Sequence, residues 1–228
     1  MNSKVSVQIN ALKILQTLCK SLALPKLVKP KNDPFETLII TIISQNTTDI
    51  NTERAFENLS NQFEITPTAL SKAETNEIEA CLHIGGLYKS KAKTIKNISK
   101  IILKKFDSSL ETILSLPLDD ARKTLVELPG IGPKTADVVL LFSADRPTIP
   151  VDTHVNRVSK RLGWVPANGD YDVVRIGLQS LFDQKDYLKV HLLLIAHGRK
   201  YCKARHPKCL ECPVNIYCPS KSSGEKYE

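Results

Sequence analysis

The chain has 228 residues, 42% hydrophobic and 25% charged, which is enough apolar material for one core or two small ones. No stretch approaches the roughly 18 apolar residues of a membrane span and no secretory signal is visible, so we expect no membrane contact and an intracellular location, in the cytoplasm or nucleoid of a prokaryote. The 32 Lys and Arg residues exceed the 24 Asp and Glu residues by 8, an excess that attracts polyanions such as nucleic acid.

Helical periodicity begins at the N-terminus. Apolar residues recur at three- and four-residue spacing through most of the chain, while the strict alternation typical of strands is scarce. Proline and glycine turns divide the pattern into about ten short helices, so we predict an all-α fold. Cys19 and Cys81 lie within apolar helical patterns, and we expect each to be a buried, inert thiol.

A lysine-rich helix follows in the first half of the chain. Residues 80–106 contain seven lysines and no acidic residue. Such a run is typical of a solvated helix face and equally of a surface that contacts phosphates, and the sequence leaves both interpretations open.

Residues 125–140 then predict a helix, a short turn and a second helix. Gly130 and Gly132 permit a tight turn, and Pro133 suits the first position of the second helix. The free amides at that helix start form a ready phosphate site, as in a helix-hairpin-helix element that holds one DNA strand. Lys134 lies in the first turn, where the helix dipole and burial both disfavour its protonated form; a neutral amine is what a nucleophile requires.

Asp152 ends the apolar segment 147–151, just before the next helical pattern. Its type and place predict a helix N-cap. Beside a breaking glycosidic bond, the same carboxylate would stabilise an oxocarbenium-like state and assist proton transfer.

Four cysteines are concentrated near the C-terminus. Cys202, Cys209, Cys212 and Cys218 are separated by six, two and five residues. Thiolates this close in sequence indicate a metal centre, either a structural zinc or a [4Fe–4S] cluster, and the presence of only one Cys-x2-Cys pair favours the cluster. Between and before these ligands lie the basic residues Arg199, Lys200, Lys203, Arg205 and Lys208, which suit contact with phosphates.

Together these motifs resemble one family. The segments Leu-Pro-Gly-Ile-Gly-Pro-Lys-Thr-Ala at 128–136, Val-Asp-Thr-His-Val-Asn-Arg at 151–157 and Ala-His-Gly-Arg at 196–199, followed by the four cysteines, resemble the endonuclease III group of the helix-hairpin-helix glycosylases. The likeness runs from about residue 33 to residue 219. It implies a bifunctional DNA glycosylase and abasic-site lyase, a monomer that acts on double-stranded DNA containing damaged bases or abasic sites.

The resemblance also implies an architecture and residue roles. Residues 34–148 would form a six-helix barrel, and residues 1–33 with 149–228 an iron–sulfur cluster domain, with DNA across the cleft between them. Lys134 would be the nucleophile, Asp152 the catalytic carboxylate and the four cysteines the ligands of a [4Fe–4S] cluster. DNA contacts would come from the hairpin, the basic C-terminal segment and the residues that fill the gap left by a flipped base: Gln45, Asn46, Leu87, Gly130, Ile131, Gly132, His154, Arg199, Lys203, Arg205 and Lys208.

Two departures from the family pattern bear on substrate range. Endonuclease III usually has glutamine where this chain has Asn46, with Gln45 one position earlier, which leaves open the choice of gap-filling amide. Pro133 replaces the basic residue often found before the catalytic lysine. Oxidised pyrimidines are the expected substrates.

Other functions fit the same residues less well. A mismatch or uracil-type glycosylase of the same superfamily usually lacks the lysine, and a non-catalytic DNA-binding module would not need both Lys134 and Asp152. A zinc-stabilised transcription regulator would need a recognition helix with base-reading side chains, for which there is no convincing candidate.

Overall fold

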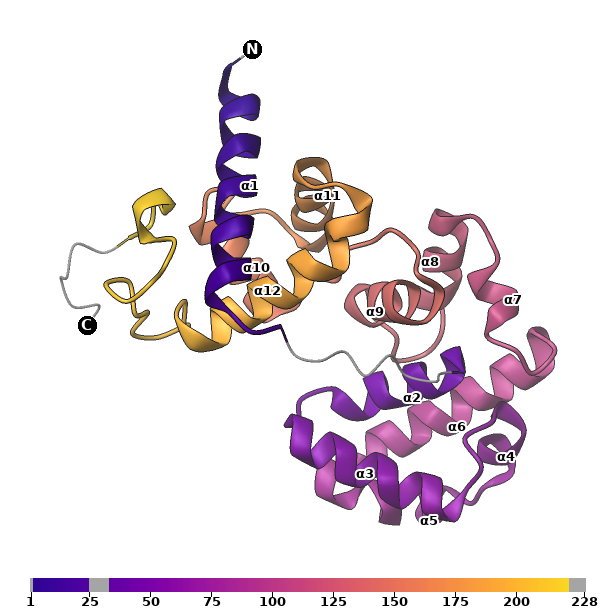
Figure 1. Cartoon of the computed structure of the whole chain (residues 1–228). Coiled ribbons are helices and arrows are strands. Elements are labelled where there is room, and N and C mark those ends of the chain that lie inside the picture. The colour runs from indigo at the N-terminus through magenta and orange to yellow at the C-terminus, as the bar shows by residue number, and fades with distance from the viewer. Residues whose placement is uncertain (1, 25–32, 222–228) are drawn as a thin grey trace. The chain divides into compact units, whose positions relative to one another are not determined.

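The computed structural model describes residues 2–24 and 33–221, and these residues form twelve α-helices, three short 3-10 helices and no strands. The predicted all-α fold is confirmed. The chain divides into two compact units, which we call the hairpin unit (residues 29–146) and the cysteine unit (residues 1–28 and 147–228). Figure 1 shows the chain passing from one unit to the other and back. In the described part, no helix has the length and apolar character needed to cross a membrane.

The hairpin unit is built around the long helix α6. Its elements are α2 (Pro34–Ser44), α3 (Asp49–Gln62), α4 (Pro67–Lys72), α5 (Thr75–Leu82), η1 (His83–Gly85), α6 (Tyr88–Lys105), α7 (Glu111–Leu114), α8 (Leu118–Val126) and α9 (Pro133–Ala144). Helices α4 and α5 pack against α6, and α2 packs against α9. Ile42, Ile95, Ile98 and Leu125 are fully buried in the shared core. Each such side chain stabilises the fold by about 1.5–3 kcal/mol relative to an exposed one.

The cysteine unit joins both ends of the chain. It contains α1 (Asn2–Ser21), α10 (Thr153–Arg161), α11 (Tyr171–Leu181), η2 (Gln184–Asp186), α12 (Tyr187–Lys200) and η3 (Asn215–Tyr217). Helices α1 and α10 both pack against α12 (Figure 1). The apolar stripe of α1, at Ile14, Leu18 and neighbouring positions, is buried in this second core.

One expectation about the thiols was wrong. Cys81 is buried as predicted, but Cys19 is exposed. The reason is its position on α1, where Ile14, Leu18 and Leu22 form the buried stripe. Cys19 follows Leu18 by one position, a rotation of about 100° around the helix, which carries its side chain to the solvent face.

Candidate active site

The predicted hairpin is formed by α8 and α9 of the hairpin unit. Gly130 in the connecting turn has φ +76°, the left-handed region that favours glycine. A Cβ atom at Gly130 would lie 2.8 Å from Cγ2 of Thr94, so a side chain there would also have to displace Thr94. Pro133 occupies the first turn of α9, as predicted. Gly132 is the N-cap of α9, with φ −92° and no atom within 4 Å of an added Cβ, so the tight turn predicted to need both glycines requires only Gly130. Gly132 and Pro133 are exposed, which leaves the start of α9 accessible.

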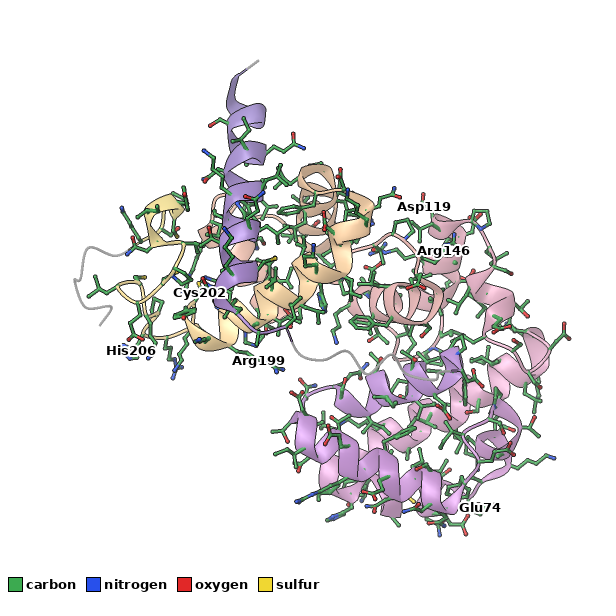
Figure 2. The ribbon with its side chains drawn as sticks, viewed as in Figure 1. Glu74, Asp119, Arg146, Arg199, Cys202 and His206 are labelled. Carbon is green, nitrogen blue, oxygen red and sulfur yellow. The ribbon has the colours of Figure 1, made fainter. Side chains whose placement is uncertain are left out.

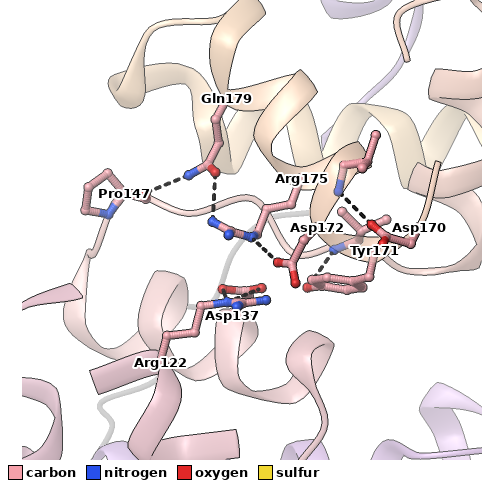
Figure 3. A network of polar contacts seen from close by, with 10 residues as sticks. Arg122, Asp137, Pro147, Asp170, Tyr171, Asp172, Arg175 and Gln179 are labelled. Carbon is pink, nitrogen blue, oxygen red and sulfur yellow. Dashed lines mark hydrogen bonds and ion pairs between the residues drawn. The ribbon is translucent and has the colours of Figure 1, made fainter. Parts of the chain in front are cut away.

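Lys134 follows Pro133 in the first turn of α9 and is partly buried. One turn further along the helix, the fully buried carboxylate of Asp137 forms an ion pair with Arg122 of α8, with 3.1 Å between Nε and Oδ1 (Figure 3). This pair connects the two helices of the hairpin. Loss of Arg122 would remove a charged hydrogen-bond donor from this buried carboxylate and so destabilise the hairpin. The helix that carries Lys134 is therefore held rigidly against its partner.

Gln45 and Asn46, at the end of α2, have different environments. The Gln45 side-chain amide donates to the carbonyl oxygen of Gly130 at 3.4 Å and to Oγ1 of Thr135 at 3.3 Å. Asn46 is exposed and has φ +54°. Gln45 therefore contacts the hairpin on both sides of Lys134 in the chain, whereas Asn46 faces solvent.

Leu87 is placed at a loop tip, as expected. Its side chain is 60% exposed, unusual for leucine, and its φ of +50° is in the left-handed region. The loop follows η1 and ends where α6 begins. Ile131, by contrast, is only 4% exposed, so its side chain packs in the core, and its backbone amide donates to the carbonyl of Leu128 at 3.1 Å. The hairpin therefore offers its exposed glycines, and not Ile131, as the surface that can approach DNA.

In the cysteine unit, Asp152 is the N-cap of α10, as predicted, and its Oδ1 accepts a hydrogen bond from the backbone amide of Val155 at 2.7 Å. The carboxylate is partly exposed. The helix dipole and this amide both favour negative charge at that position.

The segment before Asp152 is fixed by hydrogen bonds along its length. Gln179 donates to the Pro147 carbonyl at 3.0 Å, and the Val151 amide donates to the Tyr171 hydroxyl at 3.2 Å (Figure 3). The buried His191 ring lies 2.9 Å from the Pro150 carbonyl. These contacts fix the position of Asp152 at the end of this segment.

The four predicted cysteine ligands line one cavity after the end of α12. In the part of the chain that the structure describes, no three His, Cys, Asp or Glu side chains meet around a single ion position. In a [4Fe–4S] cluster, however, each thiolate binds a different iron, so the ligands surround a cavity instead of meeting at one atom. Burial raises the pKa of the Cys212 and Cys218 thiols. Metal binding requires the thiolates and offsets this effect.

Two arginines one turn apart on α10 hold the start of the cysteine region. Arg157 donates from Nε to the carbonyl of Cys202 at 3.0 Å. Arg161 lies 3.4 Å from the Cys202 sulfur and donates to the Lys203 carbonyl at 2.7 Å. Positive charge beside a thiolate suits a negatively charged cluster. The residues present thus fit the predicted iron–sulfur centre.

The basic residues around this centre lie on the surface. Arg199, at the end of α12, and Lys203, Arg205 and Lys208 are all exposed. Figure 2 shows Arg199, Cys202 and His206 at this end of the unit. Lys208 also pairs with the exposed Glu211 at 3.1 Å, a contact that solvent weakens. His154 is only partly exposed: its Nδ1 lies 3.0 Å from Arg157, and burial lowers its pKa.

Sequence reasoning had not assigned roles to Arg157, Arg161 or the Arg122–Asp137 pair. The first two follow Asp152 by five and nine residues, a spacing that places them on one face of a helix. The sequence alone does not show that this face meets the cysteine region 41 to 45 residues later.

Comparison with known proteins agrees with this arrangement. A family model described as HhH-GPD superfamily base excision DNA repair protein matches residues 39–184. A second model, the iron–sulfur binding domain of endonuclease III, matches residues 202–218, which span the four cysteines. The fold and site thus define a helix-hairpin-helix base-excision repair protein with an iron–sulfur domain.

Individual relatives narrow the class. Endonuclease III of Sulfolobus acidocaldarius is 39% identical over 185 residues, which cover 81% of each chain. Endonuclease III of Thermotoga maritima is 35% identical over 190 residues, covering 82% of this chain and 84% of that one. The solved structure of a trapped endonuclease III–DNA covalent intermediate matches with a TM-score of 0.81 and 30% identity, covering 94% of this chain and 96% of that one.

The chain belongs to the endonuclease III family. It is a DNA glycosylase with abasic-site lyase activity in base-excision repair. Oxidised pyrimidines are substrates that fit this family. Its cofactor is a [4Fe–4S] cluster. The zinc interpretation of the cysteines and the transcription-regulator alternative are thereby set aside.

Proposed function

We propose that Lys134 is the nucleophile of this enzyme and Asp152 its catalytic carboxylate, acting as a monomer on damaged double-stranded DNA in the cytoplasm or nucleoid of a prokaryote. The observation that carries the proposal is an amine in the first turn of α9, directly after an exposed helix start that suits phosphate binding. The exposed turn at Gly130 and Gly132 can hold the strand, and Lys134 follows this turn closely in the chain. Because Lys134 is so close to this turn in the sequence, its amine cannot lie far from the sugar of a strand that is held there.

The chemistry follows from these two groups. The neutral Lys134 amine attacks C1′ of the deoxyribose, and the damaged base leaves with the electrons of the glycosidic bond and takes up a proton. The Asp152 charge stabilises the positive character that develops on the sugar. Ring opening gives the Schiff base. Loss of a C2′ proton then expels the 3′ phosphate and cuts the strand, and water releases Lys134.

Base flipping needs side chains to fill the gap in the stack. We assign Leu87 and Asn46 to this role, because each is exposed at a loop tip and free of packing in the core. Gln45 is assigned to the hairpin, since its amide bonds with Gly130 and Thr135. This assignment separates two neighbouring amides that the sequence does not distinguish.

Phosphate contacts are assigned to the basic segment, with Arg199, Lys203, Arg205 and Lys208 at the surface. When bound, the [4Fe–4S] cluster cross-links the four thiolates and so anchors the segment that carries these residues. His154 lies in the N-terminal turn of α10, next to Asp152, and we assign it a contact with DNA at that position.

A panel of duplexes with single lesions tests the proposal. Each duplex carries one oxidised pyrimidine, one uracil, one mismatch, one oxidised purine or one abasic site. We expect release of the oxidised pyrimidine together with strand cleavage before any alkali is added, because the Schiff base drives β-elimination. Base release that gives strand breaks only after alkali treatment would show a glycosylase without lyase action. It would contradict the role of Lys134.

A further inference from the structure

One lysine of the basic run on α6 differs from the others. Lys91 is only 4% exposed, whereas Lys89, Lys93 and Lys100 on the same helix are exposed. Its ammonium group donates to the carbonyl of Ile43 at 2.8 Å and to the carbonyl of Gly85 at 2.9 Å. A buried ammonium is unfavourable unless such partners compensate it, so these two hydrogen bonds explain why the charge is tolerated there.

Both acceptors lie at helix ends. Ile43 is in the last turn of α2, and Gly85 is the last residue of η1. Carbonyls at such positions lack partners within their own helix, and the Ile43 carbonyl also lies at the negative end of the α2 dipole. The Lys91 ammonium therefore caps two helices at once. Burial lowers the pKa of Lys91, and the two carbonyls favour its charged form against that effect.

The two capped helices lead into the two loops that carry the gap-filling residues. Asn46 follows Ile43 by three positions, and Leu87 follows Gly85 by two. The backbone amide of Lys91 also donates to the carbonyl of Leu87 at 3.0 Å. That backbone bond belongs to the first turn of α6, whereas the ammonium contacts both the chain before Leu87 and the end of α2.

The conformation of both loops requires such support. Leu87 has a φ value of +50°, which is unfavourable for leucine, and Asn46 has +54°, which asparagine adopts more readily than most residues but less readily than glycine. Strained conformations of this kind persist only where the surroundings enforce them. Lys91 contacts the chain shortly before each of these two positive-φ residues.

From these contacts we propose that Lys91 is a positioning residue that fixes the Asn46 loop and the Leu87 loop relative to each other, so that both side chains enter the base stack together. The inference rests on the gap-filling roles assigned above. Lys91 itself does not touch the reacting atoms. It acts through the two carbonyls.

The test compares base excision with cleavage of preformed abasic sites in Lys91→Met, a substitution that keeps length and removes the hydrogen bonds. Flipping is needed for excision and much less for an abasic site. We expect single-turnover excision to fall about 10- to 100-fold and abasic-site cleavage to change less than about threefold. A fluorescent base analogue opposite the lesion should show less unstacking with Lys91→Met than with wild-type protein.

Two controls separate positioning from general stability. Ser99→Ala removes a buried hydrogen bond on the same helix, from Ser99 to the Ile95 carbonyl at 2.7 Å, without touching either loop. Ile98→Val trims the same core. Both should lower Tm while leaving the ratio of excision to lyase rates unchanged. If Lys91→Met does not fold, Lys91→Gln, which keeps an N–H donor, should lower that ratio to a smaller degree.

A double-mutant cycle completes the test. Leu87→Ala should slow excision. The double variant should be slowed much less than the product of the two single effects on the excision rate, because both changes disable the same loop. Multiplicative effects, or a ratio unchanged in Lys91→Met, would overturn the positioning role alone. Normal excision by Leu87→Ala would instead overturn the gap-filling assignment, and the Lys91 proposal with it.

Discussion

Asp152 has a structural role that is visible in the structure and a catalytic role that is proposed, and one substitution separates them. Asn caps helices about as well as Asp but carries no charge. Asp152→Asn should therefore keep the hydrogen bond to the Val155 amide while it slows single-turnover base excision by about two to four powers of ten. Tm and excision rate are measured together on the same preparation.

A second N-cap serves as the control for this prediction. Asp33 caps α2, where its Oδ1 accepts from the Phe35 amide at 2.9 Å, and its side chain is exposed. Asp33→Asn should leave both quantities close to wild type. If Asp152→Asn lost stability in proportion to activity, capping alone would account for Asp152, and the catalytic role would be unsupported.

Among the helices, α10 connects the proposed catalytic carboxylate with the cysteine centre. Its first turn is capped by Asp152, and Arg157 and Arg161 further along reach the chain around Cys202. These hydrogen bonds connect the cysteine region with the helix whose N-cap is the proposed catalytic carboxylate.

Replacement of one ligand tests the iron–sulfur centre. Wild-type protein should contain about four irons per chain and show broad visible absorbance from thiolate-to-iron charge transfer. Cys212→Ser should lose iron and absorbance and bind lesion DNA more weakly, because Arg205 and its basic neighbours lose their anchor. Cys19→Ser is the matched control, since Cys19 is exposed on α1 and outside the centre. Stoichiometric zinc without iron in anaerobically prepared protein would contradict this prediction.

Across the full chain, local features were predictable from the sequence. The hairpin, the place of Pro133 at the start of α9 and the capping role of Asp152 depend on residues within a few positions of each other, so spacing reveals them. The helical class follows from periodicity in the same way. The division into a six-helix barrel at residues 34–148 and a cluster domain at residues 1–33 and 149–228, implied by the resemblance, stays a prediction.

Contacts between distant segments were not predictable. Lys91 appeared as one member of a basic run, and its role depends on a carbonyl 48 residues earlier in the chain. The side chain of Gln45 reaches a residue 85 positions later. Tertiary packing brings such groups together, and a single sequence contains no periodic signal that shows which distant segments will pack. The exposure of Cys19 is a similar case, because helix rotation depends on which stripe the neighbouring helices cover.

The proposed mechanism depends above all on a covalent bond between Lys134 and DNA, which borohydride trapping on a duplex with one abasic site detects. Wild-type protein should give a stable protein–DNA adduct, because borohydride reduces the Schiff base to an amine. Lys134→Gln should give no adduct and no strand cleavage, yet bind the same duplex with nearly unchanged affinity. If Lys134→Gln formed the adduct at close to the wild-type rate, another amine would be the nucleophile and the mechanism proposed for this enzyme would be wrong.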